Sequence, residues 1–471
     1  MATRIVVSKS SPVMVKPSSE PTPTSGAGAI KLSSLDKNYI GLMTTSLLMF
    51  EHPIHGGDGD APAETIKRAL SQALVHYSPI SGRFVAAAGD DDGEVYIQCN
   101  GAGVAFVAAS ANCSLREAGL FHDGSPGARP AATALLDELA AVAIPSTSID
   151  ELAVDPTGGG DALLMMQVTE FTCGGFVLGV TWNHGVADAA GMAQLLCAVG
   201  ELARGLPSPS VVPARRGDSL PTSCPPSMLA AGRLFRSFEP MAFARLAIAI
   251  PSSLIDRIRA ESSAHSPGGR PCTVFEAVAA VLWRCRTRAT MSSPDDPALL
   301  SFLVNLRELV GAEDGYYGNC IAAQVVTAAS GAVASADVVD LAKMIGRAKE
   351  RILDQFEKEK KKKDGRSDDD DDRRPPPPVE PTRDRQELAR LQYSRLVLSP
   401  WRNLGFDKAD FGGGTAARVM YHGQPMQRSP LCYITPSCHG GDGGCHCQHV
   451  CSVCVREEHV DAFIGELARF M

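Results

Sequence analysis

The sequence predicts an α/β protein of two similar-sized halves, each a mixed sheet flanked by helices, joined by a crossover loop. Three observations predict this fold: the length of 471 residues, the alternation of strand-like and helix-like segments, and a proline-rich, apolar-poor stretch over residues 205–227. A chain of this length exceeds what one hydrophobic core usually fills. Because the elements alternate on both sides of this stretch, we expect one domain over residues 1–204 and another over residues 228–471.

The first half contains the clearest strand pair. The runs LLMMQVTEF and FVLGVTWNH, separated by TCGG, predict a hairpin that ends at His184. Apolar residues at a helical spacing predict a helix before this hairpin, from Ile66 to Tyr77, and another after it, from Met192 to Leu202. Two helices therefore flank the hairpin in the sequence.

The second half repeats this mixture of elements. An amphipathic helix is predicted for TVFEAVAAVLWRCRTRA, at residues 273–289, and a buried strand for LLSFLVNL, at residues 299–306. Another strand is predicted for YYGNCIAAQVV, at residues 316–326, and a terminal helix for residues 457–471, whose apolar side chains share one face. Both halves therefore read as mixed α/β.

Residues 357–385 belong to neither half by composition. They contain blocks of like charge followed by four prolines. Such a segment buries too little apolar surface to offset its ordering entropy, so we expect a disordered insert. The alternative is an acidic metal-binding loop around residues 368–372, but this run lacks the alternating oxygen ligands of a calcium loop.

Composition restricts the function class. The chain is 44% hydrophobic and 21% charged, with a net charge of −8, whereas binding to nucleic acid phosphates requires a basic face. No secretory signal or membrane-spanning apolar run is recognisable, so we expect a cytoplasmic protein without membrane or nucleic acid partners. The 14 cysteines then read as free thiols rather than as a disulfide framework.

The stretch NHGVADAAG places a histidine where an apolar strand runs into a glycine-containing loop. A general base needs an exposed lone pair and one fixed tautomer, and His184 is positioned for this role. Asp188 either bonds the imidazole directly or anchors the loop through a basic partner or a helix N-terminus. The spacing favours anchoring, because Asp188 precedes the helix that follows. No G-x-S-x-G turn offers a nucleophile for a triad.

These residues alone also fit a core histidine followed by a capped helix, and that interpretation stays open. Among the 11 histidines, however, only His184 has an aspartate four positions later. It also lies between a hairpin and a helix, where functional residues are often carried by a rigid frame. The pattern therefore favours chemistry without naming a reaction.

A second motif is KADFGGGTAARV, at residues 408–419. NHGVADAAG followed by DFGGG resembles the BAHD family of plant acyl-CoA-dependent acyltransferases. That family has His-x-x-x-Asp near mid-chain and Asp-Phe-Gly-Trp-Gly near the C-terminus. The stretches KLSSLDK, ALSQALVHYSPISGRF, TVFEAVAAVLWRCRTRA and YYGNC agree with it, in order, and the likeness runs from about residue 5 to the end.

The resemblance implies two chloramphenicol-acetyltransferase-like domains with the histidine in a channel between them. It implies that His184 is the general base that removes a proton from an alcohol or amine acceptor, which then attacks the thioester of acyl-CoA. No acyl-enzyme and no bound cofactor are implied, because acyl-CoA is a co-substrate. We expect a monomer in plant secondary metabolism, with an aromatic acyl group such as hydroxycinnamoyl or benzoyl.

The resemblance also assigns structural roles. Asp188 matches the second position of the first motif, and Asp410 matches a structural acid that pairs with an arginine, for which Arg307 is our candidate. Gly412 and Gly414 match the glycines of the second motif, whereas Gly413 replaces the tryptophan of the family. The loss of a packed aromatic would cost roughly 3–5 kcal/mol unless neighbours fill the space. Substrate-binding residues are not identified.

Residues 432–454 invite a zinc site, because they contain six cysteines and three histidines. Their polar and apolar side chains alternate, however, which is the periodicity of a strand. On a strand Cys451 and Cys454 would point to opposite faces and could not share an ion. We therefore predict a structural strand, in which cysteine acts as a small hydrophobic residue, and no metal.

Three functions are compatible with these sequence features. The first is acyl transfer to an alcohol or amine, the second is a catalytically weak relative that only binds acyl-CoA or a phenolic ligand, and the third is a thioester hydrolase. The altered DFGGG motif keeps the second alternative open. The sequence does not name the donor or the acceptor.

Overall fold

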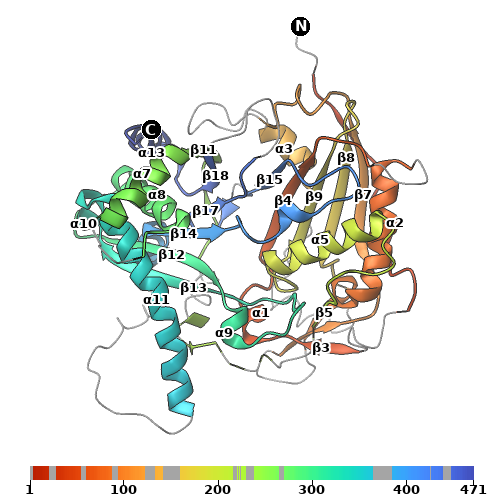
Figure 1. Cartoon of the computed structure of the whole chain (residues 1–471), viewed down its shortest axis with the longest axis horizontal. Helices are drawn as coiled ribbons and strands as arrows, with labels where there is room; N and C mark the ends of the chain where they lie inside the picture. The colour runs from red at the N-terminus through yellow and green to blue at the C-terminus, as the bar shows by residue number, and fades with distance from the viewer. Residues whose placement is uncertain are drawn as a thin grey trace.

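The computed structural model describes residues 4–20, 28–54, 60–86, 94–121, 133–141, 160–215, 220, 222, 224–226, 228–229, 238–264, 270–363, 385–424, 426–438 and 447–470. These residues form two sheet-based halves that lie side by side (Figure 1). The α/β class predicted from the sequence is confirmed.

The N-terminal half is built on a seven-stranded sheet, on the right in Figure 1. Helices α2 (Pro62–His76) and α5 (Ala189–Ala203) cover one face, and α3 (Thr133–Leu139) packs on the other. Strand residues alternate between these two cores: Leu48 faces α2 and α5, whereas Leu47 faces α3. The strand order is β1 (Val7–Lys9), β7 (Val104–Ala111), β8 (Leu164–Glu170), β9 (Phe176–Asn183), β4 (Met43–Phe50), β15 (Arg418–Tyr421), with β2 (Val13–Val15) also on β7.

The C-terminal half is built on a six-stranded sheet packed against α8 (Val274–Thr290). A capping box formed by Thr273 and Glu276 starts α8, and residues 276–287 are buried except for Arg284. Around it lie α7 (Ser252–Ala264), α10 (Ser330–Ser335), α11 (Val338–Lys363) and α13 (Val460–Ala468). The strand order is β11 (Leu246–Pro251), β18 (Cys447–Val453), β17 (Leu431–Ile434), β14 (Arg395–Pro400), β12 (Pro297–Asn305), β13 (Ile321–Ala329).

Shorter elements connect these layers. A three-stranded sheet, in the order β3, β6, β5, lies below the N-terminal sheet in Figure 1. The bounds are β3 (Ala29–Lys31), β6 (Val95–Gln98), β5 (Arg83–Ala86), β10 (Met241–Ala242), β16 (Met426–Gln427), α1 (Ser34–Lys37), η2 (Ser78–Ser81), α9 (Arg307–Val310), α12 (Arg385–Ser394), η3 (Phe406–Lys408) and η4 (Glu457–His459).

Strand β15 joins the two halves through backbone pairing. It comes from the C-terminal half of the chain, yet it pairs antiparallel with β4, with Val419 opposite Leu48. The boundary between the sheets therefore does not coincide with the crossover at residues 205–227. A division of the chain at that crossover is wrong for β15.

The crossover makes contacts with both halves where it is described. Ala214 forms a bridge with Tyr316, and the next residue, Arg215, is buried. Arg215 pairs with Asp36 of the N-terminal half and lies over the rings of Tyr316 and Tyr317 of the C-terminal half. The crossover is therefore more than a surface linker.

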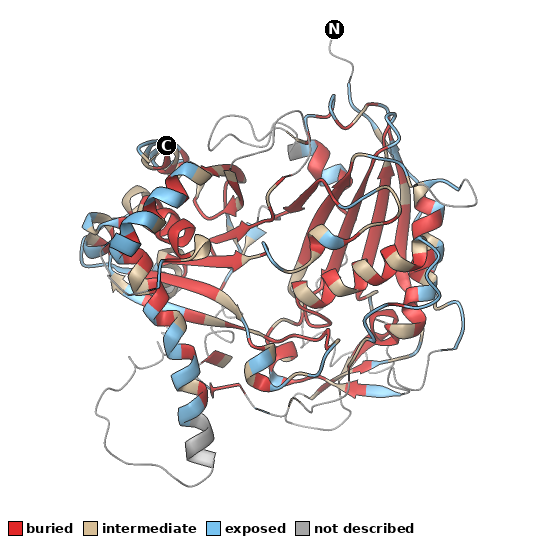
Figure 2. Ribbon diagram, in the orientation of Figure 1, coloured by how far each residue is buried: buried red, intermediate tan, exposed pale blue. Residues whose placement is uncertain are grey.

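Most sequence-based element predictions are confirmed. The hairpin is β8 and β9, with Leu164 opposite Trp182, and the predicted helices correspond to α2, α5, α8 and α13. The predicted strand at residues 299–306 corresponds to β12, and the one predicted at residues 316–326 corresponds to β13, which begins only at Ile321. Buried strands in both sheets are visible in Figure 2, with the exposed residues concentrated on the outer helices.

The prediction of a disordered insert over residues 357–385 is wrong at its ends. Residues 357–363 continue α11 although all of them are Glu or Lys, and Arg385 begins α12. The rest of the predicted insert, residues 364–384, lies outside the described residues. The acidic run at residues 368–372 is part of that stretch.

The cysteine-rich segment forms a strand, as predicted, over residues 447–453. Strand β18 lies between β11 and β17, and Cys454 packs into the C-terminal core. Among the described residues, no group of three or more His, Cys, Asp or Glu is placed to hold a metal ion. Twelve described cysteines carry free thiols, whereas Cys447 is disulfide-bonded, so the free-thiol expectation is wrong for Cys447.

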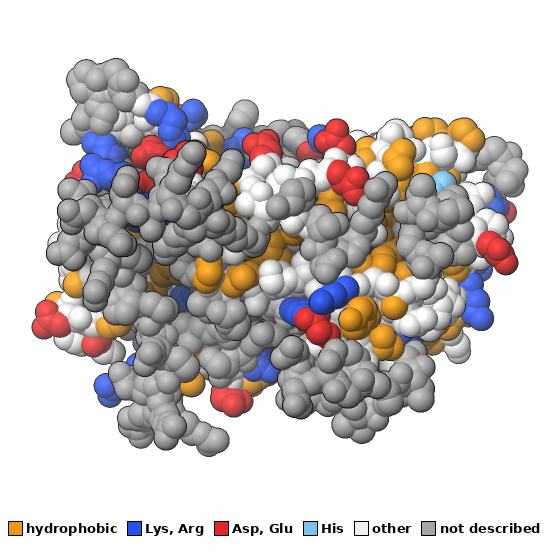
Figure 3. Space-filling model, turned by 90° about the horizontal axis from the view of Figure 1, so that it is seen from below, with side chains coloured by type: hydrophobic (Ala, Val, Ile, Leu, Met, Phe, Trp, Pro, Cys, Tyr) orange, Lys and Arg blue, Asp and Glu red, His pale blue; other side chains and the backbone are white. Residues whose placement is uncertain are grey.

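The molecular surface gives little sign of one dominant charge on the face shown in Figure 3. Basic and acidic side chains are interspersed there, with hydrophobic side chains between them. Within the described part of the chain, no helix is both long enough and apolar enough for a membrane crossing.

Because β15 comes from the C-terminal half of the chain but pairs with the N-terminal sheet, we expect the two halves to unfold together. Variants that keep either Trp182, in the N-terminal core, or Trp283, in the C-terminal core, would report on each half separately. We expect the two fluorescence transitions in guanidinium chloride to have the same midpoint, because the N-terminal sheet takes β15 from the C-terminal half of the chain. Two separated midpoints would show that the halves are independent.

Candidate functional site

His184 follows the last residue of β9 and is held by its backbone. Its N–H donates to Leu42 O at 2.8 Å, which extends the pairing of β9 with β4 by one residue. The side chain is 7% exposed and lines a cavity of about 130 Å³. The sequence prediction placed this histidine at the end of a strand, and the structure places it there.

The cavity lies between the two halves of the chain. Its N-terminal wall includes Tyr39, Leu42 and His184, and its C-terminal wall is one face of the six-stranded sheet. That wall is mostly apolar and is formed by Leu303, Val304, Ile321, Ala323, Val397, Leu431 and Tyr433. A concave, largely apolar space with a few polar groups is the usual form of a small-molecule site.

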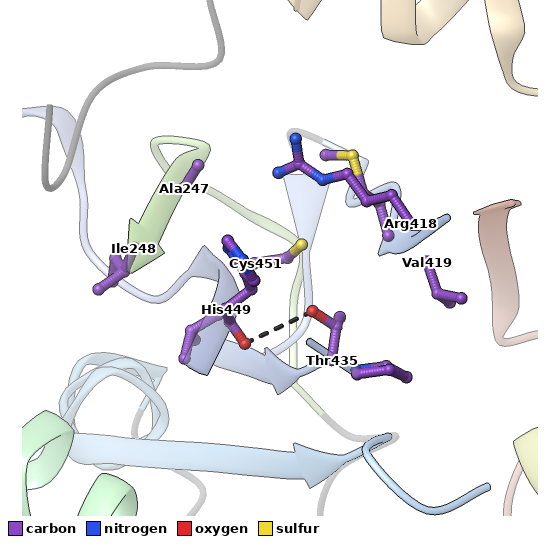
Figure 4. Close-up of a pocket in the computed structure, with 10 residues that line it drawn as sticks. Ala247, Ile248, Arg418, Val419, Thr435, His449 and Cys451 are labelled. Atoms are coloured by element: carbon purple, nitrogen blue, oxygen red, sulfur yellow. Dashed lines mark hydrogen bonds between the residues drawn. The ribbon is translucent and has the colours of Figure 1, made fainter. Parts of the chain in front are cut away.

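A second cavity, shown in Figure 4, lies between β15 and the strands β11 and β18. His449 and Cys451 line it together with Arg418, and Thr435 Oγ1 donates to His449 O at 3.4 Å. Its volume is about 10 Å³, which is enough for roughly one water molecule. A substrate does not fit there, so the larger cavity at His184 is the candidate site.

Asn319 fixes the tautomer of His184. The Asn319 amide nitrogen donates to His184 O at 2.8 Å and to Asp36 Oδ1 at 2.9 Å, so both of its hydrogens are used. Asn319 Oδ1 must therefore be the atom that faces His184 Nδ1, at 3.0 Å. A carbonyl oxygen only accepts, so Nδ1 carries the proton and Nε2 keeps its lone pair.

Asp36 and Arg215 hold Asn319 in this orientation. The Asp36 carboxylate accepts from the backbone N–H of Asn319 at 3.0 Å and caps α1 together with Ser33. Arg215 pairs with Asp36 at 3.3 Å, and both side chains are at most 3% exposed. An ion pair at this depth, between the crossover and α1, fixes the residue that orients the histidine.

Asp188 does not bind the imidazole. Its Oδ1 accepts from Gly191 N at 2.9 Å, which caps α5, and its carboxylate is bound by Arg307 at 2.8 and 2.9 Å. Cys320 N donates to the same carboxylate at 3.0 Å. Of the two roles that the sequence left open for Asp188, the structure therefore shows loop anchoring, through a helix N-terminus and a basic partner.

The predicted pairing of Arg307 with Asp410 is wrong. Arg307 binds Asp188 in a two-pronged geometry, whereas Asp410 lies 3.7 Å from Arg204, with both side chains 32% exposed. The resemblance of the DFGGG motif to the family implied that an acid pairs with an arginine, but it did not show which acid and which arginine form the pair. Arg307 follows β12, and the pairing of β12 with β13 brings it to the start of α5.

Asp410 organises its own loop instead. Its Oδ1 accepts from Gly412 N at 2.8 Å and from Gly414 N at 3.1 Å. Both glycines have positive φ, of 110° and 99°, a region that other residues rarely adopt. Asp410, Gly412 and Gly414 thus form one turn next to α5, and none of them lines the cavity.

Gly413 replaces an aromatic residue of the family without leaving a hole. A Cβ at this position would overlap Pro53 O and lie 2.9 Å from His52 O, so the backbones already touch. The neighbouring Phe411 fills the adjacent core, at 5.3 Å from the ring of Phe50 in an edge-to-face arrangement. The loop packs directly against the backbone of residues 52–53.

Burial determines the charge state of His184. Burial lowers the pKa of the imidazole below its ordinary 6.5, and this effect outweighs the opposing attraction of Asp188. Burial alone would raise the pKa of Asp188, but Arg307 and the hydrogen bonds from Cys320 and Gly191 hold that pKa below its ordinary value. His184 is therefore neutral near pH 7, and Asp188 is ionised.

Sequence reasoning missed several residues of this site: Tyr39, Asp36, Arg215, Asn319 and Arg395. Asp36 and Asn319 lie inside KLSSLDK and YYGNC, two stretches that resemble the family, but nothing local marks them as partners of His184. Their separation from one another is 283 positions. Only the packing of the halves reveals the network.

Removal of Arg307 tests the observed pairing. Arg307→Met leaves the buried carboxylate of Asp188 without its counter-charge, and we expect a loss of about 3–5 kcal/mol in the free energy of unfolding. Arg204→Met, at the exposed pair, should cost at most about 1 kcal/mol. A double-mutant cycle should show strong coupling of Arg307 to Asp188. Coupling to Asp410 instead would restore the pairing expected from the motif.

Gly413→Trp tests whether the family residue still fits. We expect destabilisation by several kcal/mol, measured by denaturant unfolding, because the new side chain meets the backbone at residues 52–53 rather than a cavity. Gly160→Trp, at a position with open space around it, is the matched control. An increase in stability on Gly413→Trp would show that the tryptophan pocket persists.

Comparisons with known proteins identify the family of this chain. A family model described as "Transferase family" matches residues 5–464. The chain is 44% identical to "Acyl transferase 15" of Oryza sativa subsp. japonica, over 99% of this chain and 98% of that protein. It is 30% identical to a myricetin 3-O-glucosyl 1,2-rhamnoside 6'-O-caffeoyltransferase of Crocosmia x crocosmiiflora, over 98% and 99%.

Solved structures share the fold. Vinorine synthase superposes with a TM-score of 0.63 at 19% identity, over 97% of this chain and 96% of that one. The F. graminearum TRI101 protein, in complex with coenzyme A and deoxynivalenol, also gives 0.63, at 14% identity over 92% and 96%. With the family match over nearly the whole chain, these findings make the protein an enzyme of the Transferase family, the acyl-CoA-dependent acyltransferases called BAHD.

Proposed function

We propose that the protein transfers an acyl group, aromatic in its preferred substrates, from coenzyme A to an alcohol or amine, with His184 as the general base. His184 Nε2 accepts the acceptor proton while the acceptor oxygen or nitrogen attacks the thioester carbonyl carbon. The tetrahedral oxyanion collapses, the C–S bond breaks, and the imidazolium returns the proton to the thiolate. Proton transfer of this kind contributes roughly 10²–10⁴-fold to the rate.

One observation carries this proposal: His184 faces the interdomain cavity in the tautomer that a base requires. Its Nδ1 is engaged by Asn319, and none of the described residues hydrogen-bonds Nε2. The ring also lies against Tyr39, with centroids 4.7 Å apart, so its plane is supported from one side. A base whose tautomer and plane are fixed before substrate arrives has less to reorganise during the reaction.

The relatives support the choice of substrates. A caffeoyl group is aromatic, and the relative named for its transfer covers almost the whole chain. The TRI101 structure holds coenzyme A together with deoxynivalenol in the same fold. We extend the proposal to a monomer in the plant cytosol that serves secondary metabolism, in line with the family resemblance.

Replacement of the base tests the proposal. His184→Ala should reduce kcat by roughly 10²–10⁴-fold while acyl-CoA still binds, measured by mass spectrometry of products over a panel of aromatic and aliphatic acyl-CoAs with alcohols and amines. His76→Ala, a partly buried histidine at the end of α2, is the matched control. Release of free acid in place of acylated acceptor would favour a hydrolase, and lack of turnover by the parent would favour a binding protein.

Asn319→Ala and the pH profile test the tautomer. The variant should lose kcat rather than affinity, because the lone pair of His184 is no longer held toward the cavity. In the parent, kcat/KM should fall with decreasing pH with an apparent pKa below 6.5, since a base with a lowered pKa is protonated only in acid. An acid limb above pH 7, or an Asn319→Ala variant with parental kcat, would contradict the assignment.

A further inference from the structure

Arg395 is a charged residue in the wall of the cavity that the acyl-transfer chemistry does not use. It is the first residue of β14, a central strand of the C-terminal sheet. Alternate residues Arg395, Val397 and Ser399 line the cavity, whereas Leu396 and Leu398 lie in the C-terminal core. The pleat of β14 therefore directs the guanidinium toward the same space as His184.

The guanidinium is buried with few partners. Arg395 is 4% exposed, and its Nε donates to Ser301 Oγ at 2.7 Å. Neither terminal nitrogen has a hydrogen bond or ion pair among the residues that the structure describes. An arginine has five N–H donors, so most of the hydrogen-bonding capacity of this one is unused.

The other charges of the cavity are compensated. Asp188 is neutralised by Arg307, and burial keeps His184 uncharged near pH 7. Burial lowers the pKa of Arg395 to about 10, so it remains a cation, and burial raises the pKa of the adjacent Tyr39 phenol, which stays neutral. Among the described lining residues, Arg395 thus leaves one positive charge in excess.

We propose that Arg395 binds a carboxylate group of the substrate. A planar guanidinium fork matches a carboxylate bidentately, and the apolar walls formed by Leu303, Val397 and Leu431 strengthen that pairing by excluding water. A buried cation without a counter-charge is costly, and an anionic ligand removes that cost. The inference rests on the proposed acyl transfer and narrows its substrates to carboxylate-bearing ones.

Two substrates can supply this carboxylate. One is a hydroxy acid or amino acid that accepts the acyl group, and the other is a dicarboxylic acyl-CoA whose free carboxylate enters the cavity. Both use the same pairing with Arg395. They differ in which substrate loses affinity when the arginine is replaced.

Binding measurements test the pairing without turnover. In the His184→Ala background, ligand-induced shifts of Tm would be measured for aromatic hydroxy acids against their methyl esters, and for malonyl-CoA against propionyl-CoA. We expect one acidic ligand to bind at least about 30-fold more tightly than its neutral partner, and Arg395→Met to abolish that difference. Arg402→Met, which removes an exposed arginine beyond the same strand, should preserve it.

The kinetic arm uses the full-length enzyme. The ratio of kcat/KM for the acid to kcat/KM for its ester should fall in Arg395→Met and recover in part in Arg395→Lys, which restores the charge. If Arg395→Met does not fold, Ser301→Ala, which releases the guanidinium from its hydrogen bond, should lower the same ratio.

Several outcomes would overturn the inference. One is equal binding of acids and neutral partners by the parent, and another is an unchanged ratio in the variants. A uniform loss of affinity for every acyl-CoA would assign Arg395 to coenzyme A itself. Acyl transfer to neutral acceptors with no acid preference would refute the carboxylate pairing and leave the proposed function intact, so the two failures are distinguishable.

Discussion

The ion pair between Asp188 and Arg307 is the interaction on which the site depends. Asp188 caps α5 in the N-terminal half, and the same carboxylate binds Arg307 and the backbone of Cys320 in the C-terminal half. One buried acid therefore connects the loop that carries His184 to the strand that begins next to Asn319. Because Asp188 is fully engaged, it leaves the imidazole to another partner.

That partner is an amide, and the choice has a chemical consequence. A carboxylate on Nδ1 would add a full negative charge that raises the pKa of His184, whereas the neutral Asn319 raises that pKa less than Asp188 does and leaves burial as the dominant effect. Burial then keeps the ring neutral. The negatively charged Asp36 does not contact the imidazole. It accepts a hydrogen bond from Asn319, which it holds in place, and its charge is compensated by Arg215. The arrangement yields a neutral base with one defined tautomer.

Local pattern was sufficient to predict much of the fold. The hairpin that ends at His184, the helices on both sides of it and the buried α8 follow from apolar periodicity, which each segment carries by itself. The anchoring role of Asp188 followed from its place before a helix. The strand character of the cysteine-rich segment followed from the alternation of its polar and apolar side chains, although its cysteines and histidines also suggested a metal site.

Partner choice could not be predicted, because it depends on how distant segments meet. The motif of Asp410 suggested an arginine, but the register of β12 and β13 delivers Arg307 to Asp188 instead. Contacts between distant segments also determine three other features. These are the pairing of β15 with the N-terminal sheet, the hydrogen-bond network that holds His184, and the position of Arg395. The compact loop at Gly413 depends on a backbone contact with residues 52–53 that no local pattern records.

In the proposed reaction the proton acceptor is a single neutral imidazole, that of His184, which Asn319 keeps protonated on Nδ1. Nitrogen NMR of histidine-labelled enzyme measures that state directly, with His184→Ala to identify the signal. At neutral pH we expect a neutral ring whose Nδ1 bears the proton, and we expect this tautomer preference to be lost in Asn319→Ala. A protonated ring, or a proton on Nε2, would contradict it.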